Sequence, residues 1–389
     1  MTTFLHTADW QLGKPYGALA DASNRVLLQE ERFVAISRIA QVVRSTGVSF
    51  VVVAGDLFDS PSPERPVVSR ACAAIGELGV PVYVIPGNHD HGGPLGPWEQ
   101  AFFQQERDQL APNLHVLLGS APVHADGALL FPCPLTRRHE PEDLTAWLRQ
   151  PQELLAALPV HTPRIVLAHG SIQDFSAERD DDERSTGVNL LNLAALDHSH
   201  WDYLALGDWH GCKEVAPKAW YAGTPEPDRF PRGAEYQAGQ VLVVKVQRGQ
   251  SPVVTPYTTA GIGWHTLEHT FYGNDDLELL RSRYDTLIGS RVSRDLLKLD
   301  LSGALGISAQ NTLASMLDTW STRLLRLDRR GHVAMTATEE DITNLTNRVG
   351  DPVTALIATA LRDRLAVDTQ RDLAEACLRE LHQAVNGGH

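Results

Sequence analysis

Acidic, amide and imidazole side chains stand directly after five short apolar segments of this 389-residue sequence. Such donors suit divalent ions such as Mn²⁺, Fe²⁺ and Zn²⁺, and Mn²⁺ is favoured because oxygen ligands dominate. The candidate ligands outnumber those of one tetrahedral ion, so two ions that share a carboxylate are the simplest interpretation. The residues concerned are Asp9, Gln11, Asp56, Asp59, Asn88, His89, Asp90, His169, Asp208 and His210.

The apolar segments indicate strands buried on both faces, because they are rich in Val, Ile, Leu and Tyr and are bounded by Gly, Pro or Asp. Helix-like stretches lie between them, which predicts a layered α/β domain. Ligands of open α/β sheets bind beyond the carboxyl ends of strands, so we expect five polar strand ends to converge on one crevice. The expected strands cover residues 4–6, 50–54, 80–85, 114–118, 128–131, 164–168, 203–206 and 240–246, and the expected helices cover 27–45, 66–78 and 142–158.

Part of the sheet is expected to be antiparallel, because residues 114–131 and 240–257 have hairpin-like spacing. Beyond a break at 261–263 the pattern is a strand at 264–271, a helix opened by Asn274 or Asp275, and a strand at 296–301. A helix capped by Ser308 and a strand at 324–328 follow. This β-α-β-α-β order predicts a small α+β domain. Apolar residues at helical spacing over 352–386 predict one broken helix or two packed helices.

We therefore divide the chain into three parts, within the two or three domains that its length suggests. Residues 1–260 form the α/β domain, 261–340 a smaller α+β capping domain, and 341–389 a helical segment that could bind a partner.

Each piece of the polar constellation alone has an ordinary structural explanation. An Asp after a strand is usually a turn former or a helix cap, and a lone His there is more often a hydrogen-bonded structural residue. Asp56 and Asp59 could simply complement a helix dipole. The run Gly87-Asn88-His89-Asp90 is harder to explain as a turn alone, and the five pieces in this order favour a common site.

Composition narrows the class of protein. There are 34 basic and 48 acidic residues, a formal charge of −14, which disfavours an extended grip on DNA or on an anionic membrane but leaves room for local basic strips. The four cysteines lack C-x-x-C spacing, so we expect neither a disulfide framework nor a zinc ribbon. No apolar stretch reaches the roughly 18 residues of a spanning helix, and the amino terminus lacks a secretory pattern. We expect a cytoplasmic protein.

The polar motifs resemble those of the calcineurin-like metallophosphoesterase superfamily. Within it, the chain is similar to the SbcD-type DNA repair exonucleases, the nuclease subunits of double-strand-break processing complexes. That closer similarity is supported by His6-Thr7-Ala8-Asp9, by residues 221–226 (YAGTPE) and by the trailing cap-like domain. The motifs are Asp9-Trp10-Gln11, Gly55-Asp56-Leu57-Phe58-Asp59, Gly87-Asn88-His89-Asp90, His169-Gly170 and Gly207-Asp208-Trp209-His210.

The resemblance implies two metal ions bridged by Asp56. One ion would be held by Asp9, Gln11, Asp56 and His210, and the other by Asp56, Asn88, His169 and Asp208. His89 would be the catalytic histidine that meets the phosphate without binding metal. Asp59 and Asp90 would orient that imidazole or hydrogen-bond the ligands.

Two positions depart from the family pattern, because Gln11 replaces a usual His and Asp208 replaces the first His of Gly-His-x-His. Gln11 offers only an amide oxygen, whereas Asp208 adds a third carboxylate and shifts the preference toward Mn²⁺ or Mg²⁺. A retuned metal pair is favoured over a chain that has lost activity.

The expected function is a Mn²⁺-dependent DNA exo/endonuclease that uses a metal-activated water. By resemblance, its partners would be DNA, an SbcC-type coiled-coil ATPase and a second copy of the chain in a homodimer, with no membrane. The alternatives are a small-molecule phosphodiesterase or phosphatase and a weakened subunit that only binds DNA ends. Bases could stack on Trp10 and Trp209, although packing explains these residues equally well. Short basic clusters lie at Arg65 and Arg70, Arg137 and Arg138, Arg229 and Arg232, and residues 323–330.

Overall fold

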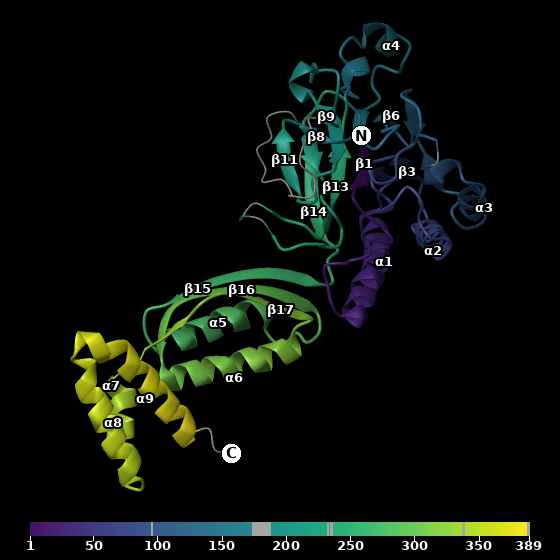
Figure 1. Cartoon of the computed structure of the whole chain (residues 1–389). Helices are drawn as coiled ribbons and strands as arrows, with labels where there is room; N and C mark the ends of the chain where they lie inside the picture. The colour runs from purple at the N-terminus through teal and green to yellow at the C-terminus, as the bar shows by residue number, and fades with distance from the viewer. Residues whose placement is uncertain (95, 173–187, 232, 234–235, 337–338, 387–389) are drawn as a thin grey trace. The chain divides into compact units, whose positions relative to one another are not determined.

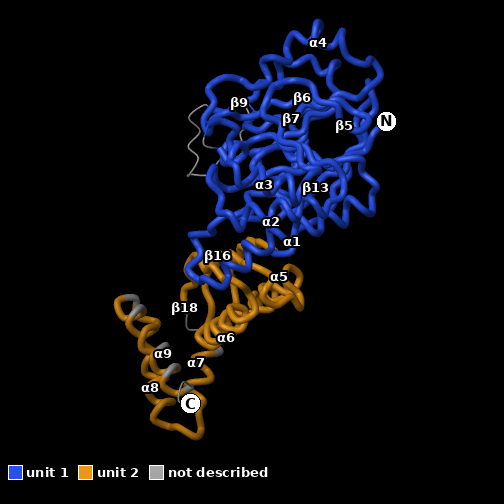
Figure 2. The backbone as a smooth tube through the Cα atoms, turned by 90° about the vertical axis from the view of Figure 1, so that its right-hand side faces the viewer, with its two compact units in different colours: residues 1–262 blue, residues 263–389 orange. Residues whose placement is uncertain are grey.

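The computed structural model describes residues 1–94, 96–172, 188–231, 233, 236–336 and 339–386. The chain forms two compact units, Met1–Ile262 and Gly263–His389 (Figure 2). The division falls two residues beyond the predicted end of the α/β domain at residue 260. The further division of the second unit into a cap and a helical segment stays a prediction.

Unit 1 is built on two six-stranded sheets. The first has the order β14-β13-β1-β2-β3-β4, in which β1 to β4 are parallel and β13 and β14 are antiparallel additions. Its strands are β1 (Thr2–Thr7), β2 (Val51–Ala54), β3 (Val82–Ile85), β4 (Leu114–Val116), β13 (Gln240–Val246) and β14 (Val253–Thr258).

The second sheet has the order β11-β12-β10-β7-β6-β5, with β6, β7, β10 and β12 parallel and both edge strands antiparallel. Its strands are β5 (Val123–Ala125), β6 (Ala128–Cys133), β7 (Arg164–His169), β10 (Tyr203–Gly207), β11 (Lys213–Ala216) and β12 (Ala219–Tyr221). A two-stranded pair of β8 (Ser171–Ile172) and β9 (Leu190–Leu191) follows β7.

The two sheets pack face to face around one apolar core. Phe4 and Val52 of the first sheet lie in the same buried cluster as Ile165 and Tyr203 of the second. The outer face of the first sheet is covered by α1 (Ala22–Thr46), α2 (Arg65–Gly76) and α3 (Ala101–Leu110). The outer face of the second sheet packs against the chain around Leu148 and Trp201. Strands buried on both faces are therefore continuous apolar runs, and the predicted layered α/β class is confirmed.

Three local predictions for unit 1 need correction. Residues 142–158 form only η2 (Ala146–Leu148) and α4 (Gln152–Ala156), because Pro151 lacks the amide proton that a continuous helix needs. The hairpin expected over 114–131 exists only as β5 with β6, since β4 pairs in parallel with β3 in the other sheet. The helix predicted from residue 27 begins at Ala22, where Asp21 accepts a hydrogen bond from the amide of Asn24. Two further 3₁₀ turns are η1 (Pro97–Glu99) and η3 (Leu193–Ala195).

Unit 2 begins with the predicted β-α-β-α-β order, and its three main strands are parallel. The helices α5 and α6 cover one face of the sheet, with Leu280 and Leu313 packed on Leu297 (Figure 1). Ser308 does not cap α6, whose first amides instead donate to the carboxylate of Asp341. The elements are β15 (Gly263–Phe271), α5 (Asp276–Ile288), β16 (Asp295–Gly306), α6 (Ile307–Arg323), β17 (Arg326–Gly331), β18 (Ala334–Thr336), α7 (Glu339–Thr346), α8 (Pro352–Leu365), η4 (Asp368–Gln370) and α9 (Arg371–Asn386).

Among the helices of the described residues, none combines the length and the apolarity needed to cross a bilayer.

A buried histidine makes unit 1 sensitive to acid. His6 on β1 is fully buried with Nδ1 3.0 Å from the hydroxyl of Tyr203, and burial lowers its pKa from 6.5 to about 3. Below pH 6.5 the unfolded chain therefore binds a proton that the folded chain does not, so the free energy of unfolding falls as pH falls toward 3. His6 contributes up to about 1.4 kcal/mol per pH unit to this loss.

We expect His6→Gln to reduce that pH dependence, because glutamine does not titrate and still offers an acceptor to Tyr203. Urea unfolding at about pH 7 and about pH 5 measures the change for both proteins. An unchanged dependence in the variant would show that His6 is not the group responsible.

Candidate metal centre

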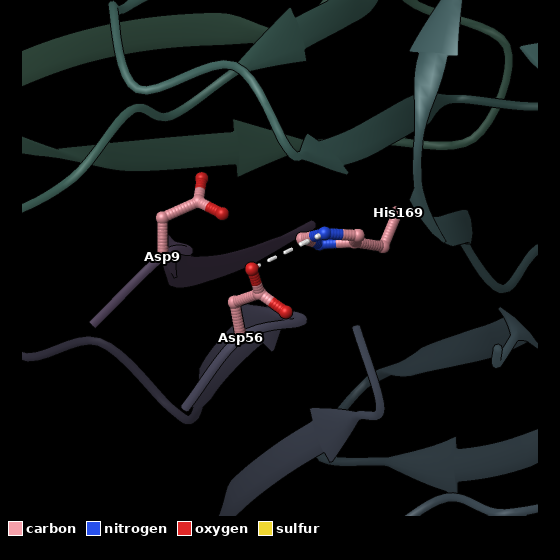
Figure 3. A group of neighbouring side chains, drawn as sticks. All are labelled: Asp9, Asp56 and His169. Carbon is pink, nitrogen blue, oxygen red and sulfur yellow. Dashed lines mark ion pairs between the residues drawn. The ribbon is translucent and has the colours of Figure 1, made fainter. Parts of the chain in front are cut away.

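Asp9, Asp56 and His169 come together at the carboxyl ends of β1, β2 and β7. One ligand atom of each lies within 4.8 Å of the others, and all three residues are buried. Their side chains point toward a common centre in Figure 3, where Nε2 of His169 is 3.6 Å from Oδ2 of Asp56. Two carboxylates and an imidazole in one buried place are donors that a divalent cation accepts.

Asn88 and Asp208 complete one side of this cluster. Nε2 of His169 lies 3.1 Å from Oδ1 of Asn88 and 3.8 Å from Oδ1 of Asp208. The backbone amide of Asp208 points at Asp9, 3.2 Å from Oδ1 and 3.3 Å from Oδ2. Five of the seven predicted ligands therefore lie around one point, and they come from five different strand ends.

Left-handed backbone turns aim the acidic side chains into the site. Asp9 and Asp56 both have φ of 54°, and Asp208 has φ of 102°. Two backbone hydrogen bonds join the first two turns. The amide of Asp9 donates to the carbonyl of Gly55 at 3.1 Å, and the amide of Gln11 donates to the carbonyl of Asp56 at 2.9 Å. Strained turns held by neighbouring backbone are typical of sites built for a ligand.

Glycines leave the space that these side chains occupy. A Cβ on Gly55, whose φ is 91°, would overlap the imidazole of His169. A Cβ on Gly87 would clash with Oδ1 of Asp56 and lie 2.5 Å from its backbone nitrogen. Both glycines are therefore required for the close approach of backbone and ligand side chains.

We expect Gly87→Ala to destabilise the fold by about 1–3 kcal/mol, because the added methyl group must displace Asp56 or the β3 loop. Retention of Mn²⁺ should fall with it. Gly119→Ala is the matched control, since nothing lies within 4 Å of a Cβ there. Urea unfolding and metal analysis compare the two variants, and equal stability would contradict the steric argument.

The electrostatics of the cluster favour an added cation. Burial, with the charges of Asp56 and Asp208, raises the pKa of Asp9 well above its usual value. Burial alone would lower the pKa of His169, but the carboxylates of Asp56, Asp9 and Asp208 raise it to about 9. Nδ1 of His169 lies 2.8 Å from the carbonyl of Ala54, so Nε2 is the nitrogen that faces the carboxylates. A divalent cation would stabilise the ionised carboxylates in place of a proton on His169, so these residues fit a metal.

Among the described residues, His210 is not part of the 4.8 Å group of Asp9, Asp56 and His169. Gln11 and His210 are instead linked to each other through Lys14 and Asp228. Oε1 of Gln11 accepts a hydrogen bond of 2.8 Å from the ammonium of Lys14. Nδ1 of His210 is 3.1 Å from Oδ1 of Asp228, and burial lowers the pKa of His210 to about 4. The neutral imidazole donates to Asp228 through Nδ1 and keeps the lone pair of Nε2, which is the form that binds metal.

His89 contacts Asp56, and Asp59 in turn contacts His89, while Asp90 lies between the loops that follow β2 and β3. The amide of His89 donates to Oδ1 of Asp56 at 3.0 Å, and its ring Nδ1 lies 3.0 Å from the backbone carbonyl of Asp59. The carboxylate of Asp90 accepts from the amides of Gly87 and Phe58 at 2.7 and 3.0 Å, which ties the β2 and β3 loops together. Burial and the charge of Asp56 raise the pKa of Asp90 to about 7.

Sequence reasoning missed four residues that support the site. Thr224 donates to the carbonyl of Asp9 at 2.9 Å, and Ser171 donates to Oδ2 of Asp208 at 2.7 Å. Lys14 and Asp228 contact Gln11 and His210 as described above. Thr224 lies in the 221–226 segment and Ser171 follows His169-Gly170, so a nearby motif in the sequence could have pointed to both residues. No motif in the sequence pointed to Lys14 or Asp228.

Partners within the protein account for several of the residues that were candidates for nucleic-acid contact. Arg70 forms two hydrogen bonds of 2.7 Å with Glu30, and Arg137 pairs with Glu140 at 2.9 Å, so both charges are neutralised locally. Trp10 is buried and donates to Thr7, so it packs and cannot stack on a base. Arg229 lies beside the metal centre, 3.3 Å from Nδ1 of His210. Arg232 lies outside the described residues.

Comparisons of the sequence with known protein families agree with a metal centre at this place. A family model for calcineurin-like phosphoesterases matches residues 2–217. SbcD, one of the subunits of the nuclease SbcCD, is 25% identical over 263 residues in Escherichia coli K12 and in Escherichia coli O157:H7, which covers 58% of this chain and 61% of each relative. The chain thus spans about three fifths of the length of these relatives. Among solved structures, TT1561 of Thermus thermophilus matches 66% of this chain and 99% of its own at 12% identity, with a TM-score of 0.39.

Proposed function

Because the chain belongs to the calcineurin-like phosphoesterase family, we propose that it is a metal-dependent phosphodiester hydrolase that cleaves DNA as an exo/endonuclease in repair or end processing. The observation that carries the proposal is the buried cluster of Asp9, Asp56 and His169, with Asn88 and Asp208 beside it. DNA as substrate is supported by the relatives, which are named as part of a nuclease.

One ion would be held by Asp56, Asn88, His169 and Asp208, and the second by Asp9, Gln11, Asp56 and His210. Divalent ions held there, Mn²⁺ above all and otherwise Mg²⁺, Fe²⁺ or Zn²⁺, would polarise a phosphodiester oxygen and lower the pKa of a water nucleophile.

The chain's own residues supply orientation and a proton. The amide of His89 fixes Oδ1 of Asp56, and Asn88 and Ala54 hold the ring of His169 on both sides. Nδ1 of His89 is directed at the carbonyl of Asp59, so Nε2 is the nitrogen that can hold a proton for the leaving oxygen. We assign His89 this role on that geometry.

We propose that α8 carries the surface for a protein partner. This helix buries one set of side chains and exposes three neighbouring apolar ones, and contiguous exposed apolar patches mark interaction sites. Together with the relatives' name as one subunit of SbcCD, this supports a coiled-coil ATPase of the SbcC type as partner. A homodimer of this chain stays a prediction. The buried residues are Thr354, Ala358 and Leu361, and the exposed ones are Val353 (66%), Leu356 (73%) and Ile357 (43%).

A substrate panel tests the function. The purified chain with Mn²⁺ is assayed on labelled duplex DNA, single-stranded DNA, bis-p-nitrophenyl phosphate and cyclic nucleotides. We expect cleavage of DNA and of the nitrophenyl diester, with loss of both on chelation. Preference for cyclic nucleotides would make the chain a small-molecule phosphodiesterase, and DNA binding without metal-stimulated cleavage would make it an end-binding subunit.

A further inference from the structure

Lys14 holds a fixed positive charge at the edge of the metal centre. Its ammonium is 2.8 Å from Oε1 of Gln11, 3.3 Å from Oδ2 of Asp228 and 3.5 Å from Oδ1 of Asp59. The side chain is only 21% exposed. The backbone holds it there as well, because the amide of Lys14 donates to the carbonyl of Gln11 at 3.2 Å. Lys14 is therefore held in the site by these contacts, unlike a lysine that is free on the surface.

The ammonium contacts the atom that Gln11 would offer to a metal. An amide side chain has one ligating oxygen, and in Gln11 this oxygen accepts from Lys14. A divalent cation bound to the same oxygen would lie close to the ammonium, and two cations at such a distance repel strongly where water is largely excluded. Gln11 is 2% exposed, so little solvent is present to screen the repulsion.

Further cations surround the same position. Asp228, which positions His210, also lies 3.6 Å from Arg32 and 3.1 Å from Arg229. The two negative charges of Asp228 and Asp59 thus face three cations, Lys14, Arg32 and Arg229. The neighbouring cluster has the opposite balance of charge, because Asp56 and Asp208, with Asp9 beside them, face one imidazole, that of His169. The two halves of the site therefore differ in charge because of the residues that surround each of them.

We infer that Lys14 makes the two metal positions unequal: the cluster of Asp56, Asn88, His169 and Asp208 retains its ion, whereas the position that uses Gln11 and His210 binds a second ion weakly because the Lys14 ammonium competes with it. The inference rests on the proposed metal-dependent function and specifies how many ions the resting protein keeps. It also gives Lys14 the role of a positioning residue that holds Gln11.

Metal stoichiometry tests the inference without any assay of activity. The full chain is saturated with Mn²⁺, desalted and analysed for metal per chain, and calorimetric titration gives the two affinities. We expect one retained ion in the wild type. In Lys14→Met, which removes the charge and keeps most of the stem, the second ion should bind roughly tenfold tighter. Lys245→Met, on the exposed side of β13, is the matched control and should behave as the wild type.

The outcomes separate the inference from the function. Two ions of equal affinity in the wild type, or an unchanged second affinity in Lys14→Met, would overturn the role of Lys14 while the metal centre stands. No retained ion and no metal-stimulated cleavage would remove the proposed function itself. Lys14→Gln serves as a second variant if the melting temperature shows that Lys14→Met disturbs the fold.

Discussion

Asp56→Asn is expected to abolish metal retention and to lower phosphodiester hydrolysis by at least about a thousandfold. Asp56 stands at the centre of the site, with Oδ1 accepting from the amide of His89 and Oδ2 3.6 Å from Nε2 of His169. Asparagine keeps the size of the side chain and tolerates the φ of 54° that this turn requires. The loss of metal and of hydrolysis would therefore result from the removal of the charge of Asp56 and not from a change of the backbone.

A second measurement on the metal-free protein makes this prediction independent of activity. The largest influence on the pKa of His169 is burial, which lowers this pKa. The next largest is the charge of Asp56, which helps to raise the pKa to about 9. Removal of that charge disfavours the imidazolium, so the pKa of His169 should fall in Asp56→Asn. An NMR titration of the imidazole signals measures the shift.

Asp108→Asn is the matched control for Asp56→Asn, because Asp108 is 66% exposed and pairs only locally with Arg107. It should leave metal content, hydrolysis and the titration of His169 unchanged. A metal-replete, active Asp56→Asn protein would contradict the placement of Asp56 at the centre of the site.

The site could be predicted from the sequence because parallel strands impose a simple geometry. Apolar runs that are buried on both faces mark the strands, and their carboxyl ends meet at the same edge of the sheets. Asp9, Asp56 and His169 follow or end three such runs, and the structure brings them within 4.8 Å of one another. Residues far apart along the chain could thus be assigned to one place from local pattern alone.

The supporting contacts could not be predicted in this way, because they depend on how loops fold over the site. Lys14 lies in a turn after β1 and Asp228 lies beyond β12, and no periodicity relates the two. Their 3.3 Å contact arises from the packing of unit 1 as a whole. The same limit explains β4, whose apolar residues fit a strand of either sheet until the neighbouring strands are in place.

His89→Asn is expected to reduce the turnover of DNA by about 10²–10⁴-fold while the metal content stays that of the wild type. Metal retention survives because His89 contacts Asp56 through its backbone amide, which the substitution keeps. The catalytic loss follows from the ring, whose Nδ1 is directed at the carbonyl of Asp59 and whose Nε2 can hold the proton. Asparagine cannot protonate an alkoxide. His161→Asn, at an exposed position, is the control and should retain full turnover.

The leaving group distinguishes a proton donor from a residue that only binds phosphate. A nitrophenolate leaves without protonation, whereas the alkoxide of a DNA strand needs a proton. If His89 supplies that proton, His89→Asn must slow DNA cleavage far more than cleavage of bis-p-nitrophenyl phosphate, and kcat must carry the difference. Equal losses of turnover on both substrates would instead indicate that His89 binds the phosphate oxygens, since stabilisation of their charge helps both reactions alike. Normal turnover of both by a metal-replete variant would leave His89 with no catalytic role.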